Sequence, residues 1–271
     1  MFKDVLIKIN SAIDAIRGLT AFMTRIPMGN FKSGFEEMSK YFVFIIFIGM
    51  FIGFIGSIAS YPFYYLGIKS NIVVGALVLF IMLYIQGFHH VDGLGDYGDA
   101  WMVMGSARKK LGVMKDKYMG VGAFVFIFFT ELISVASIGY LYEITYLDFL
   151  LFVKFIILVE ACSRLGLLAC ACCGIPSKEG TGKYFVKNTD EYQLFIGYLL
   201  LIILSFIFNI PKIGVLCSTF AIFVGTFIAW NSNKSLNYVT GDVLGASNEL
   251  TRALTFIILI SFLCSNHLNS L

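Results

Sequence analysis

From residue 41 onward, the chain alternates long apolar runs with short polar connections. A run crosses about 30 Å of hydrocarbon as a helix when it has about 20 residues at 1.5 Å of rise each. Runs of this kind lie near residues 41–66, 71–88, 121–142, 149–173, 193–210 and 213–231. A seventh, 252–265, is short and spans only if its helix begins near Leu244, which brings Glu249 and Arg252 to the membrane boundary. The pattern predicts about seven transmembrane helices, with six or eight as alternatives.

Residues 1–40 follow a different pattern, in which apolar side chains recur at helical spacing among charged ones. Such a pattern is typical of an amphipathic helix that lies in the membrane interface. No linker or low-complexity tract separates a soluble unit from the rest of the chain. We therefore predict an all-α fold in a single integral membrane domain, 1–271. Residues 1–40 form its interfacial segment and 41–271 its helical bundle with cytoplasmic loops.

Composition and charge agree with a multi-pass membrane protein. The chain is 58% hydrophobic with 28 Phe, which leaves too little polar surface to cover a soluble globule of 271 residues. Of the 20 Lys and Arg, 16 fall on alternate connections between the runs. By the positive-inside rule these connections are cytoplasmic. We expect a protein of the inner cell membrane whose active site faces the cytoplasm, with lipid and no nucleic acid as a partner.

The most informative polar stretch follows the second run directly. If residues 89–99 form a helix, His89, Asp92, Asp96 and Asp99 share an arc of about 80°. Three carboxylates this close repel each other unless a cation lies among them, and their hard oxygen atoms suit Mg²⁺ or Mn²⁺. We therefore predict a divalent metal bound by the three aspartates.

A second acidic face is predicted where the last helix begins. Asp242, Glu249 and Arg252 fall on one stripe of a helix, beside small residues. Asp242 or Glu249 can complete the metal shell. The alternative for Asp242 is a simple helix cap.

The remaining charged candidates each have two interpretations. Lys115 and Asp116 suit contact with phosphate and metal, or belong to an ordinary solvated loop. Glu160 and Arg164, four residues apart within a run, form either a buried ion pair or, through Arg164, a contact with an anionic substrate. Lys183 follows glycines that lack the full phosphate-loop spacing, and lies in a flexible loop.

Five motifs taken in order resemble the cobalamin synthase family, the adenosylcobinamide-GDP ribazoletransferases. They are Thr24-Arg25-Ile26-Pro27, the stretch from Gly87 to Asp99, Met114-Lys115-Asp116 with Gly120, Ser163-Arg164, and the stretch from Gly241 to Ala246 with Glu249. The chain departs from the family pattern at Gly95, Ala100 and Lys117-Tyr118, where alanine, glycine and Ser-Arg are usual. The last departure removes an arginine that could contact phosphate.

The resemblance implies a Mg²⁺-dependent phosphotransferase of late cobalamin (vitamin B12) biosynthesis. It would join adenosylcobinamide-GDP to α-ribazole or its 5′-phosphate, giving adenosylcobalamin or its 5′-phosphate and GMP. Catalytic roles then fall to His89, Asp92, Asp96 and Asp99, with Asp242 and Glu249 as further metal ligands. Substrate and phosphate contacts fall to Arg25, Lys115, Asp116, Arg164 and Lys183. Whether the chain forms a homodimer stays open.

Two other functions fit parts of the pattern. The acidic repeat is chemically similar to that of CDP-alcohol phosphotransferases, membrane enzymes that would use a lipid acceptor. A metal or cation transporter would also place Asp, Glu and His in the membrane. Against transport, the carboxylates gather on the cytoplasmic side, with Glu131 in the third run as the exception.

Overall fold

The computed structural model describes residues 2–268, and side chains within 8–265. Its helices are α1 (Phe2–Met23), α2 (Phe35–Ser39), η1 (Phe42–Phe44), α3 (Ile45–Ile58), α4 (Tyr61–Tyr65), α5 (Asn71–Gln86), α6 (His89–Met102), α7 (Ala107–Val113), α8 (Val121–Ile144), α9 (Phe149–Cys173), α10 (Gly182–Asn188), α11 (Glu191–Ile207), α12 (Pro211–Leu236) and α13 (Gly241–Leu268). Within the described residues, the extended structure is a single isolated bridge between Pro176 and Val239. The all-α prediction is confirmed.

Five segments of the described chain are long and apolar enough to cross a membrane. They are Phe42–Tyr65, Val121–Ile144, Phe149–Cys173, Pro211–Leu236 and Gly241–Ser265. Two bent pairs raise the number to seven, because α5 continues into α6 through a 95° bend and α10 into α11 through an 89° bend. The predicted helical bundle of about seven spans is therefore confirmed.

The last span is longer than its apolar run. α13 begins at Gly241, so the helix includes the polar segment that precedes residue 252. Its first turn carries Asp242, while Glu249 and Arg252 lie two and three turns deeper and are fully buried. The predicted early start of this helix is confirmed, and with it charged side chains enter the bundle.

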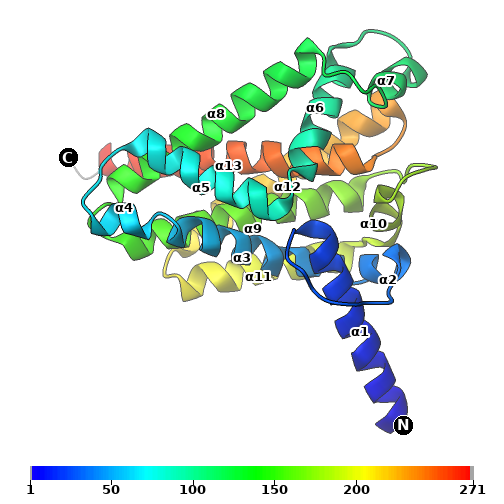
Figure 1. Ribbon diagram of the computed structural model, residues 1–271, viewed down its shortest axis with the longest axis horizontal. Coiled ribbons are helices and arrows are strands. Elements are labelled where there is room, and N and C mark those ends of the chain that lie inside the picture. The colour runs from blue at the N-terminus through cyan, green and yellow to red at the C-terminus, as the bar shows by residue number, and fades with distance from the viewer. Residues whose placement is uncertain (1, 269–271) are drawn as a thin grey trace.

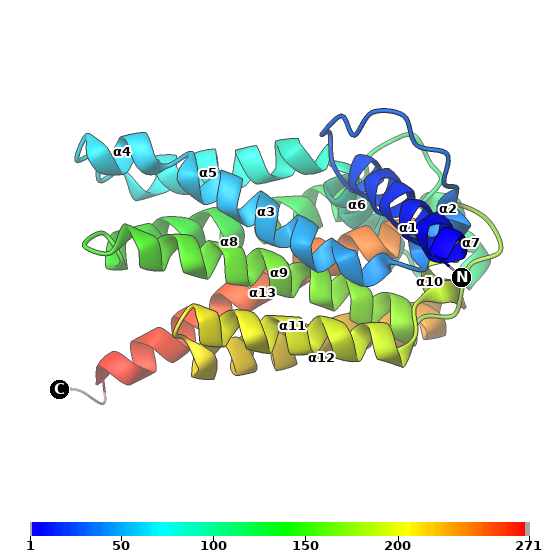
Figure 2. The same ribbon diagram turned by 90° about the horizontal axis from the view of Figure 1, so that it is seen from below.

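α9 forms the centre of the bundle, with α3, α11, α12 and α13 around it (Figure 2). Almost every α9 side chain between Phe152 and Ala171 is buried. α3 approaches closely, since a Cβ at Gly53 would lie 3.0 Å from the Ile156 carbonyl oxygen. Small residues that let backbones meet are the usual means of packing helices in membranes, where the hydrophobic effect is weak.

Five helices, α1, α2, α6, α7 and α10, gather with their connections at one end of the bundle, which we call the cationic end. It lies opposite α4 (Figure 2). α1 leaves this end at a steep angle to the bundle (Figure 1). It buries Ala15 and Leu19 while Ile9 and Ile13 are about half exposed. An exposed apolar face on a transverse helix is the arrangement expected of an interfacial helix.

Candidate active site

A sharp turn places the acidic helix across the cationic end. α5 ends in a Schellman motif, in which the Gly87 N–H donates to the Tyr84 carbonyl (3.1 Å) and the Phe88 N–H donates to that of Leu83 (3.2 Å). Gly87 has φ 79° and Phe88 φ 64°, so both adopt the left-handed conformation. α6 then starts at His89 and runs across the bundle (Figure 1). The predicted helix over residues 89–99 is confirmed.

α6 packs on the first turns of α13 at backbone distance. A Cβ at Gly93 would lie 2.8 Å from both Cα and O of Asp242, and one at Gly245 would lie 3.0 Å from Cα of His90. This approach brings the α6 carboxylates beside Asp242. Burial, followed by the negative charges of Asp242, Asp92 and Asp99, raises the pKa of Asp96 to about 7. The sequence analysis grouped Asp92, Asp96, Asp99 and Asp242 in one site, and in the structure the other three carboxylates act electrostatically on Asp96.

Asp99 also has a structural partner. Its carboxylate accepts hydrogen bonds from the backbone N–H groups of Gly120 (2.7 Å) and Ala123 (2.8 Å). Those groups are free donors at the start of α8, so Asp99 caps that helix from α6. The capping role was not predicted, because 21 residues separate Asp99 from Gly120.

Two clefts flank α6, and Asp92 lines both. The aromatic cleft, of about 270 Å³, is lined by Phe22, Met23, Phe42, Gln86, His89, His90, Asp92, Leu167, Thr181, Gly182, Phe185, Gly241, Asp242, Leu244 and Gly245. The acidic cleft, of about 380 Å³, is lined by Asp92, Gly95, Asp96, Asp99, Asp116, Lys117, Tyr118, Met119, Ala123 and Ile127. Two molecules bound in these clefts would meet at Asp92.

Arg25 and His89 lie side by side at the α5–α6 turn. A Cβ on Gly87 would lie 3.2 Å from Cγ of Arg25 and 3.1 Å from Nε2 of His89. The Arg25 guanidinium is 4.6 Å from the centre of the Tyr84 ring, and its backbone N–H donates to the Ile85 carbonyl (2.7 Å). The side chain is exposed at the edge of the site. Arg25 is thus placed where it can reach an anion.

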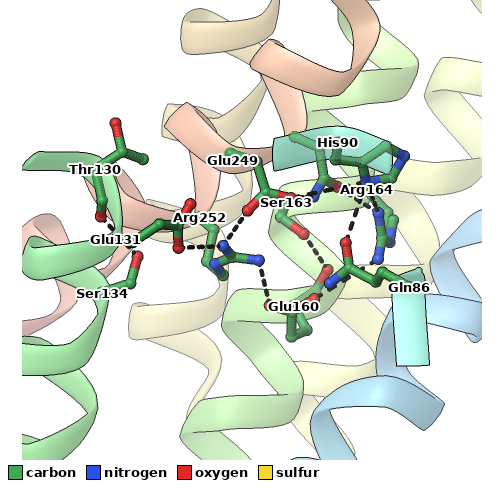
Figure 3. A network of polar contacts seen from close by, with 11 residues as sticks. Gln86, His90, Thr130, Glu131, Ser134, Glu160, Ser163, Arg164, Glu249 and Arg252 are labelled. Carbon is green, nitrogen blue, oxygen red and sulfur yellow. Dashed lines mark hydrogen bonds and ion pairs between the residues drawn. The ribbon is translucent and has the colours of Figure 1, made fainter. Parts of the chain in front are cut away.

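Arg164 lies instead in a buried polar network (Figure 3). It is 1% exposed. Its Nη1 donates to Nδ1 of His90 (3.0 Å) and Oδ1 of Asn248 (2.6 Å). Its Nη2 lies 3.9 Å from Glu160, so the predicted pairing of residues 160 and 164 is present as a buried ion pair. Because an arginine nitrogen can only donate, Nδ1 of His90 is the acceptor in this contact.

Arg252 occupies the deeper part of the same network. It forms ion pairs with Glu131 (2.8 Å), Glu160 (3.5 Å) and Glu249. Glu249 is therefore held beside Arg252 and not beside Asp242. The two acidic residues share a helical stripe but stand seven residues apart, about 10 Å along the axis. This corrects the expectation that Glu249 completes the aspartate site.

Of the other predicted contacts, Asp116 lines a cleft, while Lys115 and Lys183 are outside both linings. Lys115 pairs with Glu179 (3.2 Å), and both side chains are exposed. Asp116 lines the acidic cleft and accepts a hydrogen bond from the backbone N–H of Tyr118 (3.3 Å). Lys183 lies in the first turn of α10 and not in the flexible loop that was expected, and its Nζ is 5.0 Å from the centre of the Tyr184 ring.

Sequence reasoning missed several residues of the site. His90 and Asn248 meet Arg164, and the Phe side chains of the aromatic cleft come from α1, η1 and α10. The sequence signals of the buried network were Glu131, alone in an apolar run, and the predicted pairing of Glu160 with Arg164. His90 adjoins His89, and the direction of the turn before α6 decides which ring points inward.

The aspartates have the chemistry that a hard divalent cation requires. Asp92, Asp96 and Asp242 offer carboxylate oxygens. Burial first, and then the charges of the neighbouring carboxylates, raise the pKa of Asp96, and a bound cation would favour its ionised form. Within residues 8–265, no three His, Cys, Asp or Glu side chains already stand in coordinating geometry. The donor set fits Mg²⁺ in kind.

Comparison with known proteins assigns the family. The profile described as "Cobalamin-5-phosphate synthase" matches residues 15–260. The chain belongs to the cobalamin-5-phosphate synthase family. Relatives named adenosylcobinamide-GDP ribazoletransferase include those of Methanococcoides burtonii (26% identical, 90% of this chain and 91% of that protein), Archaeoglobus fulgidus (28%, 89% and 94%) and Pyrococcus furiosus (29%, 90% and 98%). No solved structure matches. The resemblance drawn from the five motifs is confirmed.

Proposed function

We propose that this chain is an adenosylcobinamide-GDP ribazoletransferase of cobalamin biosynthesis. The relatives that carry this name match about nine tenths of the chain. One observation from the structure carries the proposal, namely that Asp92 lies between two clefts on the two flanks of α6. A transferase needs two substrates to meet at one reacting group, and this arrangement provides that meeting point.

The reaction is a phosphoryl transfer. A ribose hydroxyl of α-ribazole, or of its 5′-phosphate, attacks the phosphorus that stays with cobinamide, so a new P–O bond forms. The bond to the GMP oxygen breaks, and GMP leaves with that electron pair. The hydroxyl proton passes to a base, for which His89 or a neighbouring carboxylate is placed at the aromatic cleft. Arg25 would contact phosphate oxygens at the edge of the site.

Mg²⁺, with Mn²⁺ as an alternative, is the metal that suits this site. Asp92, Asp96 and Asp242 would hold it, with Asp99 supporting them from its capping position. When bound, the ion neutralises diphosphate charge and favours in-line attack. Glu249 is left out of this ligand set because Arg252 already holds it.

We further propose that the cationic end faces the cytoplasm. The connections at this end carry most of the Lys and Arg, and the positive-inside rule assigns such connections to the cytoplasm. Adenosylcobinamide-GDP carries a charged diphosphate and would reach the clefts from the aqueous side. The exposed Ile9 and Ile13 of α1 would contact membrane lipid.

The test is an assay of GMP release by the purified protein in lipid nanodiscs, with adenosylcobinamide-GDP and α-ribazole. We expect release that needs both substrates and Mg²⁺, and loss of release in Asp92→Asn. Replacing α-ribazole with a lipid alcohol tests the CDP-alcohol phosphotransferase alternative, and metal flux into sealed vesicles tests transport. GMP release that does not depend on α-ribazole, or metal flux in the absence of nucleotide, would overturn the proposal.

A further inference from the structure

Side chains from three other helices surround His90 in the first turn of α6 (Figure 3). Its Nδ1 lies 3.1 Å from Oε1 of Gln86 on α5, 3.0 Å from Nη1 of Arg164 on α9, and 3.8 Å from Oε1 of Glu249 on α13. Arg164 is the donor among these groups, so the imidazole accepts through Nδ1. The contact with Arg164 thus joins the acidic helix to the central helix of the bundle.

Arg164 is itself enclosed by neighbouring residues. Asn248 accepts a 2.6 Å hydrogen bond from it, Glu160 lies 3.9 Å away, and a Cβ at Gly49 of α3 would lie 2.6 Å from its Cγ. The side chain is 1% exposed, and it is absent from the described linings of both clefts. A substrate phosphate in either cleft would therefore not touch it.

The contact between Arg164 and His90 affects the position of the α6 aspartates. His90 packs with its Cα against Gly245, and one turn later Gly93 packs against Asp242. Asp92 lies between these two contacts on α6. A shift of the first turn would therefore change how Asp92 and Asp96 face Asp242.

We propose that Arg164 is a positioning residue that, by holding His90, sets α6 so that its aspartates and Asp242 form one metal site. The proposal rests on the proposed function for its link to turnover, and its metal-binding part can be measured without turnover. Replacing a residue that orients metal ligands without binding the metal itself typically lowers metal affinity by about 10–100-fold. We expect the affinity for Mg²⁺ and for Mn²⁺ to fall by a factor of that size.

The buried network supplies a matched control. Arg252 is also fully buried and paired with glutamates, but its ion pairs run to α8, α9 and α13 and not to α6. Arg164→Lys and Arg252→Lys both keep the charge and lose the guanidinium geometry. His90→Gln removes the imidazole while Arg164 stays, so it provides a second probe if Arg164→Lys does not fold.

The experiment measures Mn²⁺ binding to the purified proteins by electron paramagnetic resonance, together with the apparent KM for Mg²⁺ and for adenosylcobinamide-GDP in the GMP assay. Arg164→Lys and His90→Gln should each weaken Mn²⁺ binding and raise the Mg²⁺ KM by about 10–100-fold. Arg252→Lys should lower thermal stability and change both metal constants much less than Arg164→Lys does. The double variant of residues 90 and 164 should be no worse than the poorer single one, because both changes break one contact.

Three results would overturn the proposal. If Mn²⁺ affinity and the Mg²⁺ KM stayed at the wild-type level in Arg164→Lys and His90→Gln, the contact between these two residues would not position the metal ligands. An equal effect in Arg252→Lys would mean general loosening of the bundle. A raised KM for adenosylcobinamide-GDP with unchanged metal constants would make Arg164 a direct substrate contact. Should the wild type bind Mn²⁺ without releasing GMP, the proposed function fails while the binding comparison still decides the role of Arg164.

Discussion

The contact between α6 and α13 can be tested by adding one methyl group at Gly93. The new Cβ would lie 2.8 Å from Cα and O of Asp242, whereas ordinary van der Waals contact begins at 3.4 Å. Both atoms are backbone, so they cannot rotate away. The helices must separate by about 0.6 Å, the difference between these two distances, or α6 must turn.

Overpacking of this kind costs about 1–3 kcal/mol of folding free energy. The displacement also moves the aspartates of α6 away from Asp242. Because a misplacement of about 1 Å at a catalytic site can cost about 100-fold in rate, a shift of about 0.6 Å predicts a loss of about tenfold or more. Gly93→Ala should therefore lower both stability and turnover.

Gly112→Ala is the matched control for this change. Gly112 lies within α7, and a Cβ there would meet nothing within 4 Å. Alanine in a helix interior is favoured over glycine by about 0.5–1 kcal/mol, so this variant should melt at or above the wild-type temperature with full activity. Thermal unfolding in nanodiscs and initial rates of GMP release measure both effects. If Gly93→Ala matched Gly112→Ala in both, the close approach of α6 to α13 would be refuted.

Three further predictions concern the carboxylates. Chelation by EDTA should abolish GMP release, and added Mg²⁺ should restore it. Asp92→Asn should raise the Mg²⁺ concentration needed for activity by about tenfold or more. GMP release that persists in EDTA would contradict the metal site. The Asp96 pKa is raised from 3.8 to about 7, so the folded protein holds a proton there below pH 7 that the metal must displace. Apparent Mg²⁺ affinity should therefore fall as pH drops from about 8 to 6, and Asp96→Asn should make this dependence weaker. An equally steep pH dependence in the variant would argue against a role of Asp96 protonation. Asp99→Asn weakens the acceptor for the Gly120 and Ala123 N–H groups, so it should lower the free energy of unfolding by about 0.5–2 kcal/mol; an unchanged denaturation midpoint would contradict the cap.

Much of the fold follows from local sequence. Apolar runs of membrane length report spans directly, because a backbone in hydrocarbon must satisfy its hydrogen bonds within its own helix. The phase of Asp92, Asp96 and Asp99 on a helix is likewise a local property, fixed by 3.6 residues per turn. For the same reason, the i, i+4 pairing of Glu160 with Arg164 could be predicted.

Other features could not be predicted, because they depend on which helices meet. The 95° bend sends α6 across the bundle, and it makes His90 the buried ring and His89 the one near Arg25. The common stripe on α13 suggested that Asp242 and Glu249 act together. The structure separates them, because Glu249 forms an ion pair with Arg252 deeper in the bundle.

The sequence by itself determined the helical spans, their cationic connections and the acidic face of α6, since each depends on residues within a few turns of one another. Only the tertiary structure decided that Asp99 caps α8, that Arg164 holds His90, and that Asp92 stands between two clefts. These depend on backbones that approach through glycines from distant parts of the chain. Helical periodicity reports which face of a helix is apolar or charged, but carries no information about the partner that covers it.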